Sequence, residues 1–574
     1  MAYVIKKIVN GRPYYYLKQS KRLGNRVVSK TIAYFGKKKP TKQEIEKKLS
    51  VVPNVVPKTK AVVPNVVPKE SISFKLIEKT PAALEIDEMA VFCKKKGFVY
   101  PAAEIYGGLS GFFDYGPLGT ELNNAIKASW WKKFVQDRDD VIGIDGSVIT
   151  HQKIWEASGH LTGFSDLMIT CSKCNTKVRA DQYLEEHIKK GNIKDELVLE
   201  GITDEEINKV IKAYDLKCPK CKSDFKEAKS FNLMFPINVG AGKESDSTSY
   251  LRGETAQVIF ANFKLLTETN RLKLPFGIAQ VGKAFRNEIS PRDFLFRVRE
   301  FEQMEIEFFV HPEKQEECPY YDEIKNMKIN YFDNKNESQT TIDTIPANKW
   351  LKYWLGKEYE WFLEYGITPE NLRVRQHSKN ELAHYATSCF DIEYKFPFGW
   401  KEIYGNADRG CFDLSQHQNH SKKSMEIFDE ETKQKVLPVV ASEPSQGVGR
   451  AFLAFLFDAY TQNEKGEIVL RLDPRFAPTK AAVFPLVNKP ELIKIAKEIS
   501  QELGKEFNTT YDQSGSVGRR YARNDEAGTP YCITVDFDSL KDKSVTIRDR
   551  NTTEQKRVKI EHLREILAKL INKT

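Results

Sequence analysis

The stretch from Phe276 to Phe309 constrains the fold of this chain more than any other part of its sequence. It reads FGIAQVGKAFRNEISPRDFLFRVREFEQMEIEFF, with two strand-like runs around a polar, proline-containing loop. This pattern predicts an antiparallel hairpin. Burying cations and a carboxylate beside an aromatic ring is costly without a ligand, so we expect a binding site, with a salt-bridged surface strand as the alternative. Alternation along the second strand places five side chains on one face: Arg297, Arg299, Phe301, Gln303 and Glu305.

Several common nucleotide and hydrolase motifs are absent. The run Gly240-Ala241-Gly242-Lys243 is followed by Glu244, so it lacks the spacing and the hydroxyl residue of a P-loop. No GxGxxG opens a βαβ unit, and no GxSxG marks a hydrolase elbow. A nucleotide therefore has to bind by another route.

Length and composition indicate a folded protein with several domains. The chain has 574 residues, of which 40% are hydrophobic and 29% charged. It contains no run of 18 apolar residues, and its N-terminus lacks a signal-peptide core, so we expect no membrane span and a cytoplasmic location.

The positive charge is concentrated at the N-terminus. Residues 1–50 contain 14 Lys or Arg and 2 Asp or Glu, a local charge of +12, so the remainder of a chain with net charge +10 sums to −2. A basic arm on a nearly neutral body indicates contact with a polyanion, and a solvated tail is the alternative.

Composition divides the chain into four parts. Residues 1–50 are expected to form a small basic β module, ending in a short helix at Thr41–Leu49, and they resemble the leading module of some transposase-like proteins. The repeat VVPNVVPK makes 51–70 an extended, proline-rich linker. Residues 71–465 form the main body, with insertions at 171–230 and 311–395. Residues 466–574 alternate strand and helix, which predicts a separate α/β domain with a parallel or mixed sheet.

Four of the nine cysteines form two CxxC pairs. Two such turns can present four thiolates to one tetrahedral Zn²⁺, which predicts a structural zinc site rather than a catalytic one, because four thiolates leave no open position. The alternative is four reduced cysteines without metal. The predicted ligands are Cys171, Cys174, Cys218 and Cys221. Lone histidines are expected to be structural or on the surface: His160, His377, His384 and His417.

The hairpin resembles motif 2 of the class II aminoacyl-tRNA synthetases, which has Arg-x-Glu (here Arg286-Asn287-Glu288), a loop and an aromatic strand. The segment GVGRAFL at 447–453 resembles motif 3. Motif 1 corresponds to the helix expected at Glu121–Asp137 and the following strand, without the usual proline. The resemblance implies an α+β multidomain fold: an antiparallel-sheet core at 71–465 and a C-terminal anticodon-binding domain at 466–574, with a basic loop at Gly515–Tyr521.

Within class II, four segments resemble the glycyl-tRNA synthetases: LRGETAQ at 251–257, FEQME at 301–305, EIYGNADR at 402–409 and EPS at 443–445. Gly253 and Val258 depart from the family pattern without changing Glu254. The resemblance implies activation of glycine with ATP, transfer to tRNA(Gly), and a homodimer. The remaining alternatives are a synthetase for another small amino acid and a synthetase-derived tRNA-binding regulator.

The resemblance also assigns roles around ATP. Arg286 is expected to hold the α-phosphate, Arg450 the γ-phosphate and Glu402 a Mg²⁺ ion, while Phe301 stacks on adenine. Arginine suits phosphate because its planar fork is always charged. Arg286, Glu288 and Arg450 are the expected catalytic residues. The full set expected around ATP is Arg286, Asn287, Glu288, Phe296, Arg297, Val298, Arg299, Glu300, Phe301, Glu402, Ile403, Gly447, Val448, Gly449 and Arg450.

Glycine offers an ammonium, a carboxylate and no side chain, and carboxylates around its ammonium are the expected recognition device. Steric exclusion rejects larger amino acids, so no editing site is needed. The set expected around glycine is Arg179, Glu254, Phe301, Glu302, Gln303, Met304, Glu305, Glu443, Pro444 and Ser445.

Overall fold

The structure is a computed structural model of the chain. It describes residues 2–9, 12–23, 26–36, 39–41, 72–75, 80–194, 202–240, 248–378, 381–382 and 386–572. The expected linker at 51–70 and nearly all of the helix expected at Thr41–Leu49 lie outside these residues. The chain divides into two units, Met1–Asn65 and Val66–Thr574.

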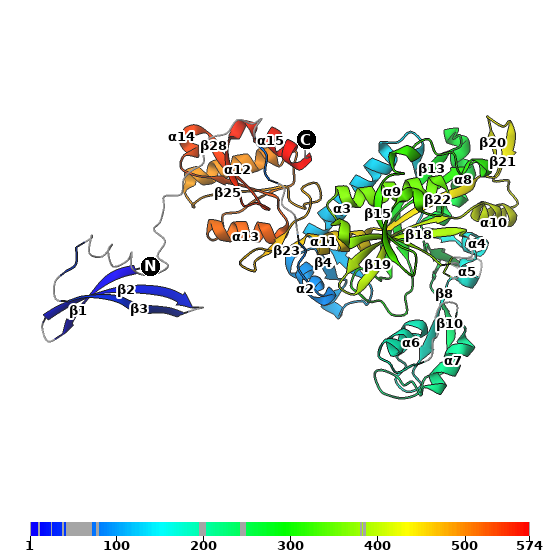
Figure 1. The fold of residues 1–574 in the computed structure, drawn as a ribbon, viewed down its shortest axis with the longest axis horizontal. Helices are drawn as coiled ribbons and strands as arrows, with labels where there is room; N and C mark the ends of the chain where they lie inside the picture. The colour runs from blue at the N-terminus through cyan, green and yellow to red at the C-terminus, as the bar shows by residue number, and fades with distance from the viewer. Residues whose placement is uncertain are drawn as a thin grey trace. The chain divides into compact units, whose positions relative to one another are not determined.

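The N-terminal unit contains the small β structure that the sequence predicts. Strands β1 (Ala2–Val9), β2 (Arg12–Leu23) and β3 (Arg26–Gly36) form an antiparallel sheet in the order β1-β2-β3 (blue in Figure 1).

A nine-stranded sheet forms the centre of the second unit, in the order β16-β15-β17-β18-β19-β22-β14-β13-β6. The predicted hairpin is confirmed as β13 (Phe276–Phe285) and β14 (Glu300–Val310), paired from Phe276↔Phe309 to Phe285↔Glu300. The sheet is antiparallel except for two parallel pairs, β13 with β6 and β15 with β17. Its other strands are β6 (Val141–Gly143), β15 (Lys328–Phe332), β16 (Glu337–Thr341), β17 (Leu372–Gln376), β18 (Ser388–Phe396), β19 (Gly399–Asp408) and β22 (Val439–Gly447).

The segment 311–395, expected as an insertion, instead supplies part of this sheet. It contributes β15 to β18 and the helix α9 (Lys349–Glu364), which packs on β19 and β22. Trp350, Trp354 and Trp361 recur at helical spacing on α9 and are fully buried, which explains why this aromatic-rich stretch belongs to the core.

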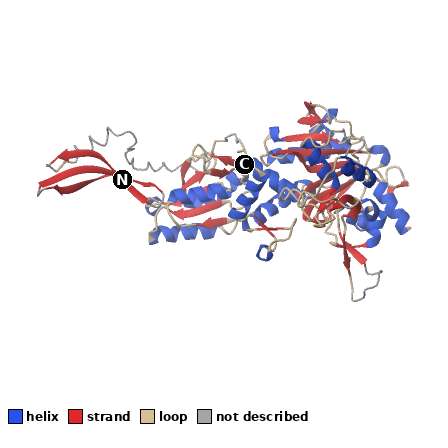
Figure 2. Cartoon of the chain, turned by 90° about the horizontal axis from the view of Figure 1, so that it is seen from below, coloured by secondary structure: helices blue, strands red, loops and turns tan. Residues whose placement is uncertain are grey.

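Helices cover the sheet and connect its strands (blue and red in Figure 2). The predicted helix at Glu121–Asp137 begins earlier, as α3 (Pro117–Trp131), and continues as a π-helical turn at Lys132–Gln136. Trp130 on α3 donates to Glu358 Oε1 on α9 at 2.9 Å. The other elements of the core are α2 (Ile86–Lys96), β4 (Val99–Pro101), β5 (Phe113–Tyr115), β7 (Ile149–His151), α4 (Gln152–Ala157), α5 (His160–Gly163), β11 (Phe235–Asn238), β12 (Thr248–Leu251), α8 (Ala256–Asn270), α10 (Phe412–Ser421), β20 (Ile427–Asp429), β21 (Gln434–Val436), α11 (Val448–Ala459), β23 (Tyr460–Gln462) and β24 (Ile468–Leu470).

The cysteine-bearing insertion has its own small hydrophobic cluster, which includes Ile169, Leu184 and Ile207. It consists of β8 (Ser165–Thr170), β9 (Lys177–Arg179), α6 (Ala180–Lys189), α7 (Asp204–Ala213) and β10 (Lys229–Asn232).

The C-terminal part is the mixed α/β domain that the alternation predicts. Its sheet has the order β26-β25-β27-β28-β29, with β25 parallel to β26 and β27 and the remaining pairs antiparallel. The prediction of a basic loop at Gly515–Tyr521 is wrong from Val517 onwards, because α13 begins there. Arg520 is 2% exposed and donates to the carbonyls of Pro485 and Gly515. The elements are β25 (Ala481–Pro485), α12 (Pro490–Leu503), β26 (Thr509–Tyr511), α13 (Val517–Ala527), β27 (Tyr531–Val535), α14 (Ser539–Asp542), β28 (Ser544–Asp549), β29 (Gln555–Lys559) and α15 (Leu563–Asn572). Within the described residues, no helix has the length and apolarity that crossing a bilayer requires.

Candidate active site

A polar cavity of about 300 Å³ lies on the central sheet. Its walls come from β14 and the loop that precedes it, from β18, β19 and β22, and from the start of α11, together with Glu254 and His377. It contains fifteen of the residues expected from the sequence: Glu254, Arg286, Glu288, Phe296, Arg297, Val298, Phe301, Gln303, Glu305, Glu402, Glu443, Ser445, Gly447, Gly449 and Arg450.

Two of the three arginines that line this cavity, Arg286 and Arg450, lie against aromatic rings. The Arg286 guanidinium lies 5.1 Å from the ring of Phe164 and 5.3 Å from that of Phe301, and its Nε donates to the Gly253 carbonyl at 3.1 Å. Arg450 lies over the ring of Phe296 at 4.5 Å. Aromatic faces hold both forks in place while leaving N–H groups for anionic oxygens.

Arg450 and Glu402 form an ion pair, with Nη1 2.9 Å from Oε2. Burial raises the pKa of Glu402, but the charge and hydrogen bond of Arg450 outweigh it and hold this pKa below its ordinary value. The carboxylate therefore stays ionised and can act as an oxygen ligand.

The loop between β13 and β14 is held by Arg299. This side chain donates to the Glu288 carbonyl at 3.0 and 2.7 Å and to the Ser110 carbonyl at 2.7 Å. Arg297 instead turns into the cavity, where its Nε lies 3.2 Å from Glu288 Oε2. Arg299 thus holds the loop through backbone carbonyls. Contrary to expectation, it does not line the cavity.

Three carboxylates from distant segments of the chain also line the cavity: Glu254, Glu305 and Glu443. Ser445 donates to Glu305 Oε1 at 2.8 Å, and the Thr255 hydroxyl donates to the other oxygen. Glu307 lies close to Glu305 and Glu443 and is fully buried, and among the described residues neither of its carboxylate oxygens has a hydrogen-bond partner. One carboxylate oxygen from each of Glu305, Glu307 and Glu443 lies within 4.8 Å of the other two.

Arg409 supplies the positive charge in this acidic cluster. It is 1% exposed and donates to Glu443 Oε1 at 2.6 Å and to both oxygens of Asp413 at 2.7 and 2.9 Å. One arginine among several acids leaves an excess of negative charge that suits a cation.

The pKa values of Glu305, Glu443 and Glu254 shift in different directions, because burial and neighbouring charges act on each acid differently. Burial raises the pKa of Glu305, and the charge of Glu254 raises it further. Burial raises the pKa of Glu443 to about 8, with Arg409 opposing and Glu305 and Glu254 adding to the rise. Burial acts in the same direction on Glu254, but the charges of His160, Arg409 and Arg286 prevail and lower its pKa.

Two histidines that were expected to be structural or on the surface contact residues of the cavity. His160 Nε2 lies 3.3 Å from Glu254 Oε2, and His377 Nε2 lies 2.7 Å from Asp391 Oδ2. His377, Cys389 and Asp391 all line the cavity near Glu402 and were missed. No motif marks them, because β17 and β18 place them there only through sheet pairing.

Nine expected residues do not line the cavity. On β14 the alternate residues face away: Glu302 accepts from Asn123 and Lys127, and Met304 is in the hydrophobic core. Ile403 and Val448 are likewise core residues. Arg179 pairs instead with Asp166 at 2.8 Å and Asp181 at 2.7 Å in the insertion. The complete set is Arg179, Asn287, Arg299, Glu300, Glu302, Met304, Ile403, Pro444 and Val448.

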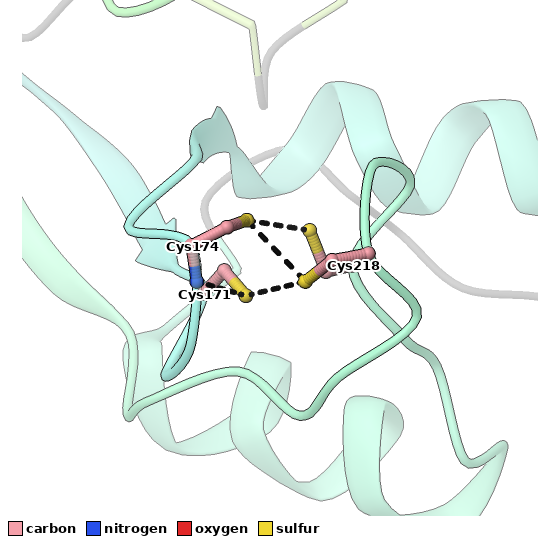
Figure 3. Close-up of side chains that lie close together, drawn as sticks. Cys171, Cys174 and Cys218 are labelled. Carbon is pink, nitrogen blue, oxygen red and sulfur yellow. Dashed lines mark hydrogen bonds between the residues drawn. The ribbon is translucent and has the colours of Figure 1, made fainter.

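The four cysteines of the CxxC pairs converge as predicted (Figure 3). Sγ–Sγ distances are 3.4 Å for Cys171–Cys221, 3.6 Å for Cys174–Cys218 and 3.3 Å for Cys174–Cys221. Disulfide sulfurs are about 2.0 Å apart, whereas four sulfurs at about 2.3 Å from a tetrahedral Zn²⁺ are about 3.8 Å apart. The set fits a zinc ion.

Two family profiles match the chain. One is described as "tRNA synthetase class II core domain (G, H, P, S and T)" and matches residues 241–395, and one described as "Anticodon binding domain" matches residues 480–570. Together with the nine-stranded sheet and its arginine-bearing hairpin, these matches define a class II aminoacyl-tRNA synthetase.

Comparison with similar proteins identifies the family within this class. A glycine–tRNA ligase of Caldanaerobacter subterraneus is 46% identical over 491 residues, covering 85% of this chain and 98% of that protein. A glycine–tRNA ligase of Geobacillus thermodenitrificans is 44% identical over 499 residues, covering 86% and 99%. The chain belongs to the glycine–tRNA ligase family.

Proposed function

We propose that this chain activates glycine with ATP in the cavity described above and transfers it to the 3′ end of tRNA(Gly). The observation that supports this is the convergence of Glu254, Glu305 and Glu443 in the same cavity as Arg286 and Arg450. An acidic end suits an ammonium group, and a cationic end suits a triphosphate. The reaction then needs no nucleophile from the protein.

Activation joins the two ends. The glycine carboxylate attacks the α-phosphorus of ATP, the bond to the β-phosphate oxygen breaks, and pyrophosphate leaves. Arg286 neutralises the charge that develops on the α-phosphate and orients the attacking carboxylate, and Arg450 holds the γ-phosphate. Phe301 stacks on adenine, while Glu288 accepts from its amino group and pairs with Arg297.

Transfer uses the same geometry. A ribose hydroxyl of the terminal tRNA adenosine attacks the carbonyl carbon of glycyl-adenylate, and AMP leaves with the former α-phosphate. The C-terminal domain, which matches an anticodon-binding profile, positions the tRNA.

The acidic end recognises the glycine ammonium through Glu254, Glu305 and Glu443, with Ser445 fixing the Glu305 carboxylate. Glycine specificity further requires that the space beside the α-carbon be filled, so that alanine and serine are excluded sterically. A synthetase for another small amino acid would not need this many carboxylates. A catalytically inactive regulator would not need to retain Arg286, Glu288 and Arg450 together.

Two metals fit the residues present. A Mg²⁺ ion bound by Glu402 would neutralise phosphate charge, and Glu402 is ionised and beside Arg450, as that role needs. A Zn²⁺ ion would be held by Cys171, Cys174, Cys218 and Cys221 and would stabilise the insertion. A homodimer in the cytoplasm is also part of this proposal, based on the resemblance to the homodimeric synthetases.

The test is ATP–pyrophosphate exchange with each of the 20 standard amino acids. Glycine should drive exchange, and alanine and serine should not. Comparable exchange with alanine or serine would reject glycine specificity while keeping the class II assignment, and no exchange with any amino acid would favour the regulator.

A further inference from the structure

A histidine, a cysteine and an aspartate form a group of potential metal ligands in the wall of the cavity. One donor atom from each of His377, Cys389 and Asp391 lies within 4.8 Å of the other two. All three residues line the cavity. The roles proposed above for binding ATP and glycine use none of them, so their convergence needs a separate explanation.

The pairing of β17 with β18 places these side chains on one face of the sheet. The last pair of the ladder is Gln376↔Phe390. The next residue, His377, donates its backbone N–H to the Cys389 carbonyl at 3.0 Å, so these two residues lie opposite each other. Asp391 is two residues beyond Cys389 on β18 and therefore shares its face. Three donors thus converge from two adjacent strands.

The donor set selects the kind of ion. Imidazole nitrogen and thiolate sulfur are ligands for Zn²⁺ and similar transition metals, whereas Mg²⁺ takes oxygen ligands. Three protein ligands leave one position of a tetrahedral ion open. Because all three side chains line the cavity, the open position faces the cavity.

The local geometry can admit an ion with a small adjustment. His377 Nε2 lies 2.7 Å from Asp391 Oδ2. Nitrogen and oxygen ligands of a tetrahedral Zn²⁺ are about 3.3 Å apart, so the two atoms have to separate by about 0.6 Å. The nearest cation is compensated: Arg375 Nη1 lies 3.9 Å from Asp391 Oδ2, and the same guanidinium pairs with Glu381.

We propose that His377, Cys389 and Asp391 form an exchangeable Zn²⁺ site, separate from the four-cysteine cluster, and that its occupation inhibits the enzyme. Three protein ligands hold an ion less firmly than four thiolates do, so this ion can come and go. The inhibitory effect rests on the proposed function. A second divalent ion near Glu402 competes with Mg²⁺ for that carboxylate and for the phosphate oxygens of ATP.

A cobalt titration of the full chain tests the site, because Co²⁺ bound to a thiolate has a charge-transfer absorption that Co²⁺ bound to oxygen lacks. The protein is first loaded with zinc at the four-cysteine cluster and kept in excess Mg²⁺. One further equivalent of Co²⁺ should bind with this absorption. Cys389→Ser should abolish the absorption and weaken binding at least about tenfold, since losing even an outer partner of a ligand costs that much. Cys411→Ser, which changes an exposed cysteine outside both sites, should match the parent.

No further cobalt absorption in the parent, or the same absorption in Cys389→Ser, would overturn the proposal. His377→Gln keeps the thiol and should also weaken cobalt binding at least about tenfold, and parental affinity in this variant would overturn it as well. Thermal unfolding establishes that each variant is folded, and either variant alone decides the question.

Inhibition is measured on glycine-dependent pyrophosphate exchange. Added Zn²⁺ should inhibit the parent and Cys411→Ser more strongly than Cys389→Ser, and equal inhibition of all three would overturn the inhibitory role. Absent exchange in the parent would count against the proposed function, while the cobalt titration would still decide on the metal site.

Discussion

Arg409 Nη1 lies 2.6 Å from Glu443 Oε1, and both side chains are nearly enclosed. The pair links the end of β19 to β22. The other two nitrogens of the guanidinium, Nε and Nη2, donate to the carboxylate of Asp413 on α10. Arg409 therefore links Glu443 on β22 to Asp413 on α10. Removing Arg409 tests how far the stability of this region depends on compensation of charge among its acids.

We expect Arg409→Leu to lower the free energy of unfolding by about 3–5 kcal/mol, because it leaves buried carboxylates without a counter-charge. Urea denaturation measures this. The control Arg523→Leu removes a half-exposed arginine that pairs with Asp512 and should cost less than about 1 kcal/mol. Equal costs for both variants would contradict the structural role of Arg409.

We expect Arg450→Ala to reduce glycine activation by roughly 100- to 1,000-fold, the effect of losing one preorganised donor to a transition state. Folding should be preserved, since Arg450 is partly exposed and contacts Glu402 and Phe296 beside the cavity. Pyrophosphate exchange and thermal unfolding are measured together. Lys283→Ala, which removes an exposed cation of the same hairpin paired with Glu300, is the control and should leave exchange unchanged.

Glycine binding should strengthen as pH rises towards 8.5. Burial and neighbouring carboxylates raise the pKa of Glu443 to about 8, so this acid is largely neutral at pH 6.5 and ionises at higher pH. Because the ionised form attracts the glycine ammonium, the KM for glycine should fall between pH 6.5 and 8.5, by at most about tenfold per pH unit.

Glu443→Gln should abolish this dependence of KM on pH. Glu358→Gln is the matched control: Glu358 is also buried with a pKa raised to about 8, but it lies on α9 and accepts from Trp130 on α3. It should leave the KM profile intact. For both acids the raised pKa makes the folded state retain a proton that the unfolded state loses near 4.5, so their contribution to stability declines from about pH 4.5 to 8. A KM that rises with pH in the parent would refute the assignment.

Elemental analysis should find about one zinc per chain, the stoichiometry of a four-thiolate site. Cys174→Ser should reduce bound zinc and increase proteolysis within the insertion, because structural zinc contributes directly to folding. Cys411→Ser, which changes an exposed cysteine outside the cluster, should do neither. Freshly purified parent protein without zinc would reject the metal site.

Patterns with a short period were predictable from the sequence. The hairpin and the shared face of Phe301, Gln303 and Glu305 follow from local geometry, and the structure confirms both. The spacing within each CxxC pair predicted a common metal site, and the four sulfurs converge. The same alternation explains why Glu302 and Met304 do not line the cavity. A family motif names consecutive residues, but a strand presents only every second one to a given face.

The family, the motif-bearing hairpin and the mixed C-terminal domain could be predicted before the structure was known, because each depends on residues that are contiguous in the chain. The tertiary structure alone decided that 311–395 completes the central sheet, that Arg520 is buried, and that His160 and His377 meet Glu254 and Asp391. Strand order and the packing of helices on a sheet depend on the burial of the whole core. Contacts between residues far apart in the chain, which set the charge balance around Arg409, arise only when that core forms.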